Sequence, residues 1–138
     1  MRKNLPHVTC QTLASLAIIG TLLVGACSYA IKVKVLHLPN GMLEFRLERE
    51  SAFGGPAELN SFSVFEYSSG DWDYKHPVWA FDRPKGSYLK VSRVPYGSVP
   101  EGFNESTKAQ PLVLEKKYLA VAFGAGSSGS AEFKVEHK

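Results

Sequence analysis

Alternation of apolar and polar residues dominates the chain from residue 31 onward. Ile31-Lys32-Val33-Lys34-Val35 alternates strictly, and Leu43–Arg49 does so again. In an extended strand this spacing places the aliphatic side chains on one face. Pro39-Asn40-Gly41 separates the two runs, and an Asn-Gly pair accepts the positive φ angles of a hairpin turn. The pattern predicts a β-hairpin at this point.

Short runs with strand character continue along the rest of the chain. Gly54-Gly55-Pro56 interrupts them, because two glycines and a proline do not extend a strand ladder. We expect strands at 62–67, 78–81, 88–94, 118–123 and 131–135, with a weak edge strand at 103–108. No window of helical length carries an apolar stripe of period 3.6. Seven or eight short strands with turns about every eight to twelve residues predict an all-β sandwich or barrel.

A pattern near the C-terminus narrows the fold class. Leu112 is followed six residues later by Tyr118, where an alternating strand begins. This spacing resembles the tyrosine corner of immunoglobulin-like and fibronectin type III domains, in which the Leu fills the core and the Tyr hydroxyl bonds to upstream backbone. Those domains end with a strand, a hairpin loop and a final strand, as this chain does over residues 118–135. The resemblance implies an immunoglobulin-like β-sandwich spanning residues 27–138 as one domain.

The beginning of the chain has a different character. Arg2 and Lys3 form a positive end, and an apolar run from Leu13 to Ala26 follows them. A charged start, a short apolar core and small residues before a cut are typical of a secretory signal peptide. The run is shorter than the ~20 apolar residues of a spanning helix. A retained signal-anchor is the alternative that this length disfavours.

The apolar run ends at Val24-Gly25-Ala26-Cys27. These residues resemble the lipobox of bacterial lipoproteins, in which an aliphatic residue and two small ones precede the cysteine. The resemblance implies that residues 1–26 are removed, that the Cys27 sulfur receives a diacylglycerol, and that its amine is usually acylated too. Residue 28 is Ser rather than Asp, which in enterobacterial sorting implies the periplasmic face of the outer membrane. The chain also resembles small uncharacterised bacterial lipoproteins.

A competing cleavage site follows Ser28-Tyr29-Ala30, which is a small-x-small sequence. Cleavage there would release a soluble periplasmic or secreted protein. The chain has two cysteines, Cys10 in the leader and Cys27 at the lipobox. Cleavage before Cys27 leaves no second thiol for an internal disulfide, although the compartment is oxidising. A cysteine placed only where lipidation needs it favours the lipid anchor.

The net charge excludes one class of partner. The chain has 16 Lys and Arg against 13 Asp and Glu, and two of the basic residues lie in the leader. Removing 26 of 138 residues leaves a domain of 112 residues with 14 basic and 13 acidic side chains, a net charge of +1. Nucleic-acid binding requires a clustered basic face, so no nucleic-acid partner is expected. The expected partners are the membrane, through the lipid, and an envelope protein or a glycan.

A glycine motif near the C-terminus suggests cofactor chemistry but has another explanation. Residues 124–129 match G-x-G-x-x-G, yet dinucleotide binding needs a helix after the glycines, whose N-terminus meets the pyrophosphate. A strand pattern follows here, so a flexible hairpin loop is predicted. No cofactor is expected.

The titratable residues do not form a recognisable catalytic or metal motif. Asp71 and Asp73 lie near His76, but a glycosidase requires carboxylates that face each other across a cleft. We expect a solvated loop there. His37, His76 and His137 lack the spacing of zinc ligands. We expect neither a metal site nor an enzyme.

Aromatic residues in the middle of the chain provide the remaining indication of function. Trp79 and Phe81 share a strand face and are expected to fill the core. Trp72 and Tyr74 also share a face if the segment is extended, but they lie among charges beside a loop. Exposed rings of this kind bind protein partners or stack on sugars. The sequence favours a non-enzymatic interaction or structural module, with a glycan- or peptidoglycan-binding module built on these two rings as the alternative.

Overall fold

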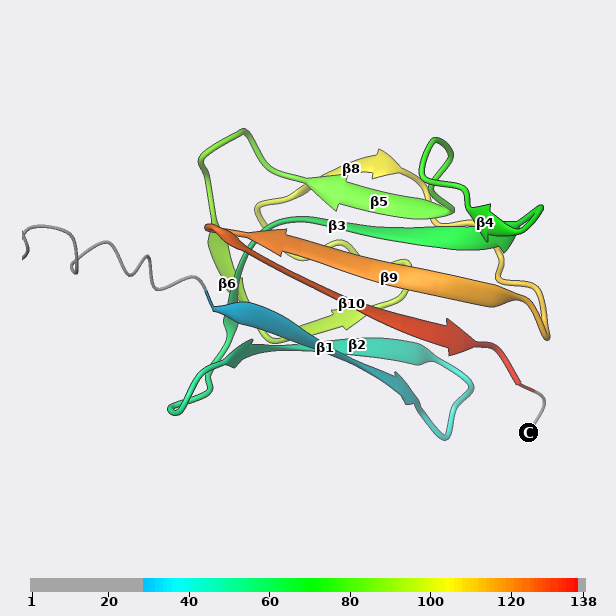
Figure 1. Ribbon diagram of the computed structural model, residues 1–138, viewed down its shortest axis with the longest axis horizontal. Helices are drawn as coiled ribbons and strands as arrows, with labels where there is room; N and C mark the ends of the chain where they lie inside the picture. Colours follow the sequence, from blue (N-terminus) through cyan, green and yellow to red (C-terminus); the bar gives the residue numbers. More distant parts are fainter. Residues whose placement is uncertain (1–28, 137–138) are drawn as a thin grey trace, which may run out of the picture.

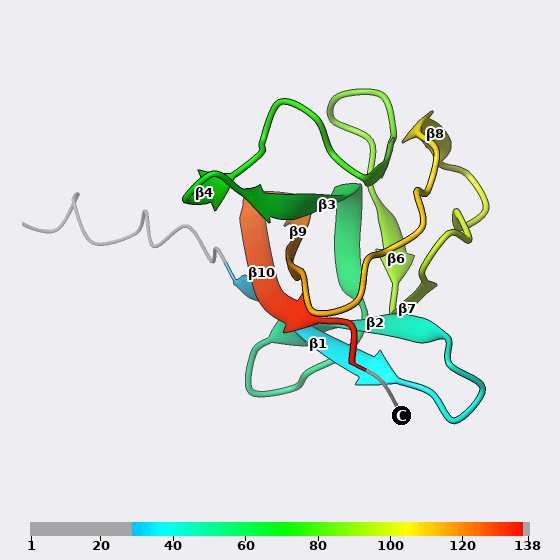
Figure 2. The same ribbon diagram turned by 90° about the vertical axis from the view of Figure 1, so that its right-hand side faces the viewer.

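The computed structural model describes residues 29–136, and these residues form two antiparallel sheets packed face to face (Figures 1 and 2). The smaller sheet has the order β1-β2-β7, and the larger sheet has the order β10-β9-β3-β5-β8, with β4 and β6 also paired to β3. The strands are β1 (Ala30–His37), β2 (Leu43–Glu50), β3 (Ala57–Ser68), β4 (Asp71–Trp72), β5 (Trp79–Asp82), β6 (Leu89–Val91), β7 (Arg93–Pro95), β8 (Asn104–Thr107), β9 (Lys117–Gly124) and β10 (Ser127–Lys134). The all-β sandwich prediction is confirmed.

The strand order is that of an immunoglobulin-like sandwich. When β1, β2, β3, β7, β9 and β10 are lettered A, B, C, E, F and G, the sheets contain A-B-E and C-F-G. The chain crosses to the larger sheet after β2, to the smaller sheet between β6 and β7, and back to the larger sheet between β7 and β8. Figure 2 shows β1 and β2 below β3, β9 and β10.

Large aromatic side chains fill the space between the sheets. Trp79, Phe81, Phe45 and Phe62 are fully buried, as the alternation of β2, β3 and β5 requires. Phe62 contacts both Phe45 and Trp79, with ring centroids 5.0 and 5.9 Å apart. Ring contacts of this geometry add to the stabilisation from burial. The prediction that Trp79 and Phe81 lie in the core is confirmed.

The tyrosine corner is present at the start of β9. The backbone N–H of Val113 donates a 2.8 Å hydrogen bond to the hydroxyl of Tyr118, whose side chain is 1% exposed. Leu112 packs against the core as a partly buried side chain. The hydroxyl therefore ties the connection before β9 to the strand that follows it.

Two sequence predictions need correction in detail. The expected strand at 88–94 is divided, because β6 pairs with β3 in one sheet and β7 pairs with β2 in the other. The expected glycine-serine loop is only a two-residue turn at Ala125 and Gly126, since β10 begins at Ser127 and pairs with β9 along its whole length. The division into β6 and β7, together with the short β4, gives ten strands in place of seven or eight.

Gly129 is required within β10 because the two sheets approach each other closely there. A Cβ atom at this position would lie 1.7 Å from the backbone oxygen of Ile31 in β1. Serine and glycine in this strand therefore leave room for the backbone of β1, rather than forming a flexible loop.

Candidate functional site

The proposed lipidation residue, Cys27, lies outside the described residues. The description starts two residues later at Tyr29, which already belongs to the folded domain. Its hydroxyl accepts a 3.4 Å hydrogen bond from the N–H of Glu58, and the guanidinium of Arg49 lies 4.5 Å from its ring centroid. Tyr29 is thus held against the end of the sandwich where β1 begins.

Trp72 is positioned by a tight hairpin at the end of β3. Ser69 and Gly70 have positive φ angles of 55° and 90°, which turn the chain back so that Trp72 pairs with Tyr67. The two rings meet edge to face at 5.1 Å. Asp71 accepts a 2.7 Å hydrogen bond from the N–H of Trp72. Trp72 is half-buried on the outward side of the larger sheet, and so neither fully exposed nor part of the core.

Tyr74 lies in the turn that follows and is more exposed. Its ring packs edge to face on Phe65, with centroids 5.2 Å apart, and 58% of the residue remains exposed. Phe65 and Tyr67 occupy outward positions of β3, because Phe62 and Val64 point into the core. Trp72 and Tyr74 therefore cover the same outward face through two different β3 residues.

Strand β9 extends this surface with residues that the sequence analysis did not single out. Of its outward positions, Leu119 is buried, Val121 is partly buried and Phe123 is 50% exposed. We call the outward surface the aromatic face, defined by Phe65, Tyr67, Trp72, Tyr74, Leu119, Val121 and Phe123. A shallow depression of about 310 Å³ lies on it between Tyr74 and Phe123. The hydroxyl-bearing residues Ser128 and Ser130 border this depression.

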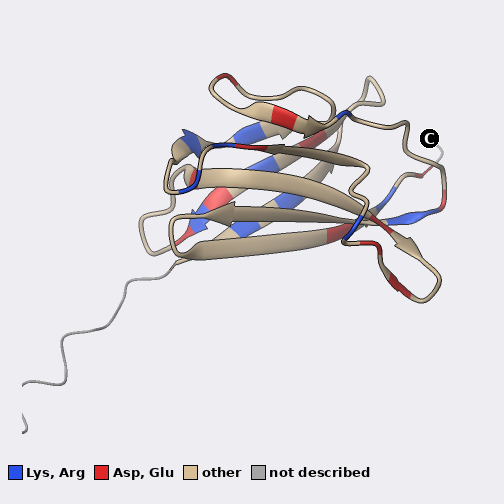
Figure 3. Ribbon diagram, turned by 90° about the horizontal axis from the view of Figure 1, so that it is seen from above, with Lys and Arg blue, Asp and Glu red and all other residues tan. Residues whose placement is uncertain are grey.

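Outward positions of β5, β9 and β10 carry charged side chains, and one of them, Lys117, lies with its ammonium 5.5 Å from the ring centroid of Tyr67. Asp82 and Glu132 are two others. In Figure 3 several long strands are tan over most of their length, whereas blue and red segments gather on others. Exposed aromatic side chains bordered by serines and a few charged residues are typical of a binding surface.

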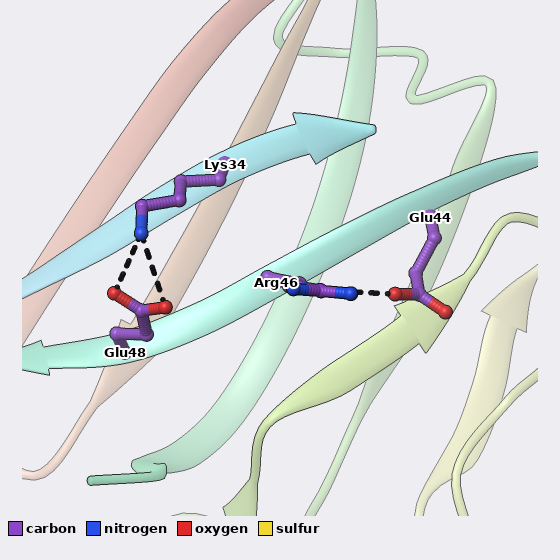
Figure 4. A network of polar contacts seen from close by, with 4 residues as sticks. All are labelled: Lys34, Glu44, Arg46 and Glu48. Carbon is purple, nitrogen blue, oxygen red and sulfur yellow. Dashed lines mark hydrogen bonds and ion pairs between the residues drawn. The ribbon is translucent and has the colours of Figure 1, made fainter. Parts of the chain in front are cut away.

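The outward face of the smaller sheet is the opposite in character. Lys34 donates hydrogen bonds of 3.0 and 3.1 Å to Glu48 on the neighbouring strand, and Arg46 lies 3.4 Å from Glu44 (Figure 4). The hydrogen bond from Lys34 holds the pKa of Glu48 below its usual value. The two sheets thus present chemically distinct surfaces to the surroundings.

The acidic residues near Trp72 are not brought together. The carboxylate of Asp71 accepts its bond from backbone, whereas both oxygens of Asp73 lie 3.1 Å from Nδ1 of His76. The hydrogen bond to His76 lowers the pKa of the Asp73 carboxyl. His37 lies elsewhere, against the backbone oxygen of Lys134, and His137 is outside the described residues. Residues 29–136 contain no group of three or more potential metal ligands.

A second cavity lies at the end of the sandwich that contains the β1–β2 turn. It has a volume of about 600 Å³, and Met42, Tyr96, Leu112 and Val135 contribute to its lining. Burial raises the pKa of Tyr96 to about 12, and its hydroxyl donates a 2.7 Å hydrogen bond to the backbone oxygen of Gln110. This hydroxyl therefore remains protonated and structural at physiological pH.

Comparisons with family models, with curated proteins and with solved structures find no match for this chain. Among the described residues, no helix is long and apolar enough to span a bilayer.

The outward residues of β9, which the sequence analysis did not single out, could have been found from the composition of the strand. Tyr118–Phe123 is apolar at every position, whereas β1 alternates with lysines. An uninterrupted apolar strand has no polar face for solvent, so its outward residues must be covered or available for binding. The contribution of Ser128 and Ser130 had no such signal, because their segment has the composition of a loop.

Proposed function

We propose that this protein is a lipid-anchored, non-enzymatic interaction module of the bacterial envelope, attached through Cys27 and binding an envelope protein through the aromatic face. The observation that carries the binding role is the exposed cluster on one outward face. Tyr67, Tyr74 and Phe123 are 40%, 58% and 50% exposed, and the Lys117 ammonium lies 5.5 Å from the ring centroid of Tyr67. Rigid aromatic residues of this kind are enriched at protein interfaces and lose little conformational entropy on binding.

The start of the folded domain supports the lipid-anchor part of the proposal. Cleavage after Ala30 would remove Tyr29, which packs on Arg49, and also the first residue of β1. Cleavage before Cys27 retains both residues. The lipobox cut is therefore the one compatible with the complete domain, and Ser28 favours sorting to the outer membrane.

A glycan is the second candidate ligand, because of the depression between Tyr74 and Phe123. Aromatic rings can stack on the apolar face of a sugar, while the hydroxyls of Ser128 and Ser130 are suited to its polar edge. Of the two rings that the sequence suggested, Tyr74 borders this depression, and Trp72 supports the surface from the side through Tyr67.

Site-specific photo-crosslinking in the native envelope tests the binding surface. A photoreactive phenylalanine in place of Tyr74 or Phe123 should produce a crosslinked protein species. The same substitution at Tyr88, which is also 40% exposed but lies outside the aromatic face, is the matched control. Equal crosslinking from all three positions, or none from any, contradicts a protein-binding role for this face.

Co-sedimentation with purified peptidoglycan distinguishes the glycan alternative. The wild-type protein should sediment with the glycan and the double variant Tyr74→Ser/Phe123→Ser should not, if the depression binds sugar. Sedimentation that is unchanged in the double variant excludes this site for glycan.

The lipid anchor is tested separately at Cys27. Cys27→Ala should abolish labelling by an alkyne fatty acid and release the protein from the membrane fraction. Undiminished labelling of Cys27→Ala would refute the anchor.

A further inference from the structure

Phe53 is the most exposed large apolar side chain among residues 29–136. It lies in the loop between β2 and β3 and is 99% exposed. The loop itself is well connected. The N–H of Gly54 donates to the oxygen of Ser51 at 3.1 Å, and the N–H of Arg49 donates to the oxygen of Gly55 at 2.8 Å. A hydrogen-bonded loop that presents a phenylalanine to solvent needs an explanation outside the domain.

Phe53 lies at the same end of the sandwich as the start of the domain. Tyr29, Phe53 and Ala125 line one open cavity, together with residues from β2 and β3. Figure 1 shows the beginning of β1, the β2–β3 loop and the β9–β10 turn at one end of the molecule, and the end of β10 at the other. The cavity lined by Met42 and Tyr96 is at the distal end.

The chain length restricts where a lipid on Cys27 could lie. Two residues of fully extended chain span at most about 7 Å, and Tyr29 is held by Glu58 and Arg49. The membrane surface would therefore lie within a short distance of Tyr29. This end of the domain has no freedom to move far from the bilayer.

The chemistry of the loop suits a membrane interface. Residues 51–56 read Ser-Ala-Phe-Gly-Gly-Pro and include no charged side chain. The nearby Arg49 is paired with Glu58 at 3.6 Å. Aromatic side chains favour the interface between headgroups and acyl chains, where a charge would oppose insertion.

We propose that the domain stands end-on upon the bilayer, with Phe53 inserted into the lipid interface beside the anchor. This inference rests on the proposed lipidation of Cys27. It assigns a lipid surface as the partner of the β2–β3 loop and sets the orientation of the whole molecule. The strands run between the two ends, so the aromatic face stands upright, accessible from the periplasm, and the distal cavity points away from the membrane.

Tryptophan fluorescence in lipid vesicles tests this arrangement. Full-length protein matured in bacteria is reconstituted into vesicles of phosphatidylethanolamine and phosphatidylglycerol, with or without brominated acyl chains. Phe53→Trp is compared with Met42→Trp, a matched substitution at a 48% exposed residue of the distal end. The emission of the native Trp72 and Trp79 is measured in wild-type protein and subtracted.

Bromine should quench the added emission of Phe53→Trp severalfold more than that of Met42→Trp. Equal quenching of the two variants would overturn the inference. A blue-shifted but unquenched Phe53→Trp would also overturn it, because protein rather than lipid would then cover the residue.

Mass spectrometry of the same purified protein separates this inference from the proposed function. Protein that lacks the lipid mass on Cys27 and stays in solution would refute the anchor itself. Lipidated protein whose Phe53→Trp emission is not quenched would leave the anchor intact and refute only the end-on docking.

Discussion

A single hydrogen bond at the buried Tyr118 restrains the connection before β9. The hydroxyl of Tyr118 accepts the N–H of Val113 at 2.8 Å in an otherwise aromatic environment that includes Phe133. No water can replace the hydroxyl easily, because the tyrosine is 1% exposed. The bond therefore restrains the connection before β9 by a contact that a phenylalanine cannot make.

Replacement of this hydroxyl should lower stability measurably. We expect Tyr118→Phe to reduce the free energy of unfolding by about 0.5–1.5 kcal/mol, as measured by urea denaturation. Tyr67→Phe is the matched control, since Tyr67 is 40% exposed and a surface change of this kind alters stability by less than about 0.5 kcal/mol. Equal losses in the two variants would contradict a structural role for the corner.

Asp73 and His76 form the other contact at the residue scale that can be measured directly. The hydrogen bond from His76 lowers the pKa of Asp73 in the folded protein. A carboxyl whose pKa is lowered by folding stabilises the fold above its unfolded-state pKa, and loses that contribution as pH falls through the folded-state value. The pair should therefore help to hold the turn that contains Tyr74 at neutral pH and release it only in acid.

Titration of the side-chain carboxyl by NMR tests this contact. His76→Ala should raise the pKa of Asp73 toward its usual value. The pKa of Glu48, which is lowered by Lys34 on the other sheet, should stay unchanged. An unaltered Asp73 titration in the variant would show that His76 is not its partner in solution.

At the scale of elements, β1 packs closely against β10 at Gly129. A Cβ at Gly129 would lie 1.7 Å from the oxygen of Ile31, so the strands could not keep their positions. The glycine is required by the neighbouring backbone, because its own φ angle is not in the left-handed region.

Gly129→Ala should therefore cost about 1–3 kcal/mol or more of unfolding free energy, as expected for overpacking. Ser130→Ala is the control, because Ser130 is the next residue of β10 and points outward. Thermal unfolding followed by circular dichroism should show a large shift for the first variant and almost none for the second. A stable Gly129→Ala protein would contradict the close approach of the two strands.

At the scale of the whole molecule, the domain begins before the first predicted strand. Tyr29 is partly buried against the core and packs on Arg49. The end that contains this contact is also the end expected to face the membrane. The proposed anchor at Cys27 would therefore lie next to a contact that stabilises the fold.

A domain comprising residues 31–138 should be less stable than one comprising residues 28–138. The loss of the hydrogen bond to Tyr29 and of its contact with Arg49 should together cost about 1–2 kcal/mol. Tyr29→Phe in the longer chain isolates the hydroxyl. Identical denaturation midpoints for the two chains would remove this argument against cleavage after Ala30.

Local pattern was sufficient to predict the fold class. Strict alternation in Ile31–Val35 and Leu43–Arg49, with Asn40-Gly41 between them, predicts the β1–β2 hairpin that the structure shows. Tyr118 and Leu112 predicted the corner. These features depend on side-chain period and turn geometry, which are local properties of the chain.

The β10 strand, the change of sheets at Ser92 and the aromatic face depend on tertiary contacts. Ser127–Ser130 has the composition of a loop but forms a strand because β9 supplies its hydrogen-bond partners. Within this strand, the backbone of β1 leaves room only for glycine at position 129. Val91 and Val94 are three residues apart, so in one continuous strand they would point to opposite faces. Both are buried because the chain changes sheets at Ser92. The aromatic face brings together residues from β3, β4, β9 and the turn containing Tyr74, and only the pairing of distant strands could place them on one surface. Local pattern specifies which way each side chain points, whereas strand pairing specifies its neighbours.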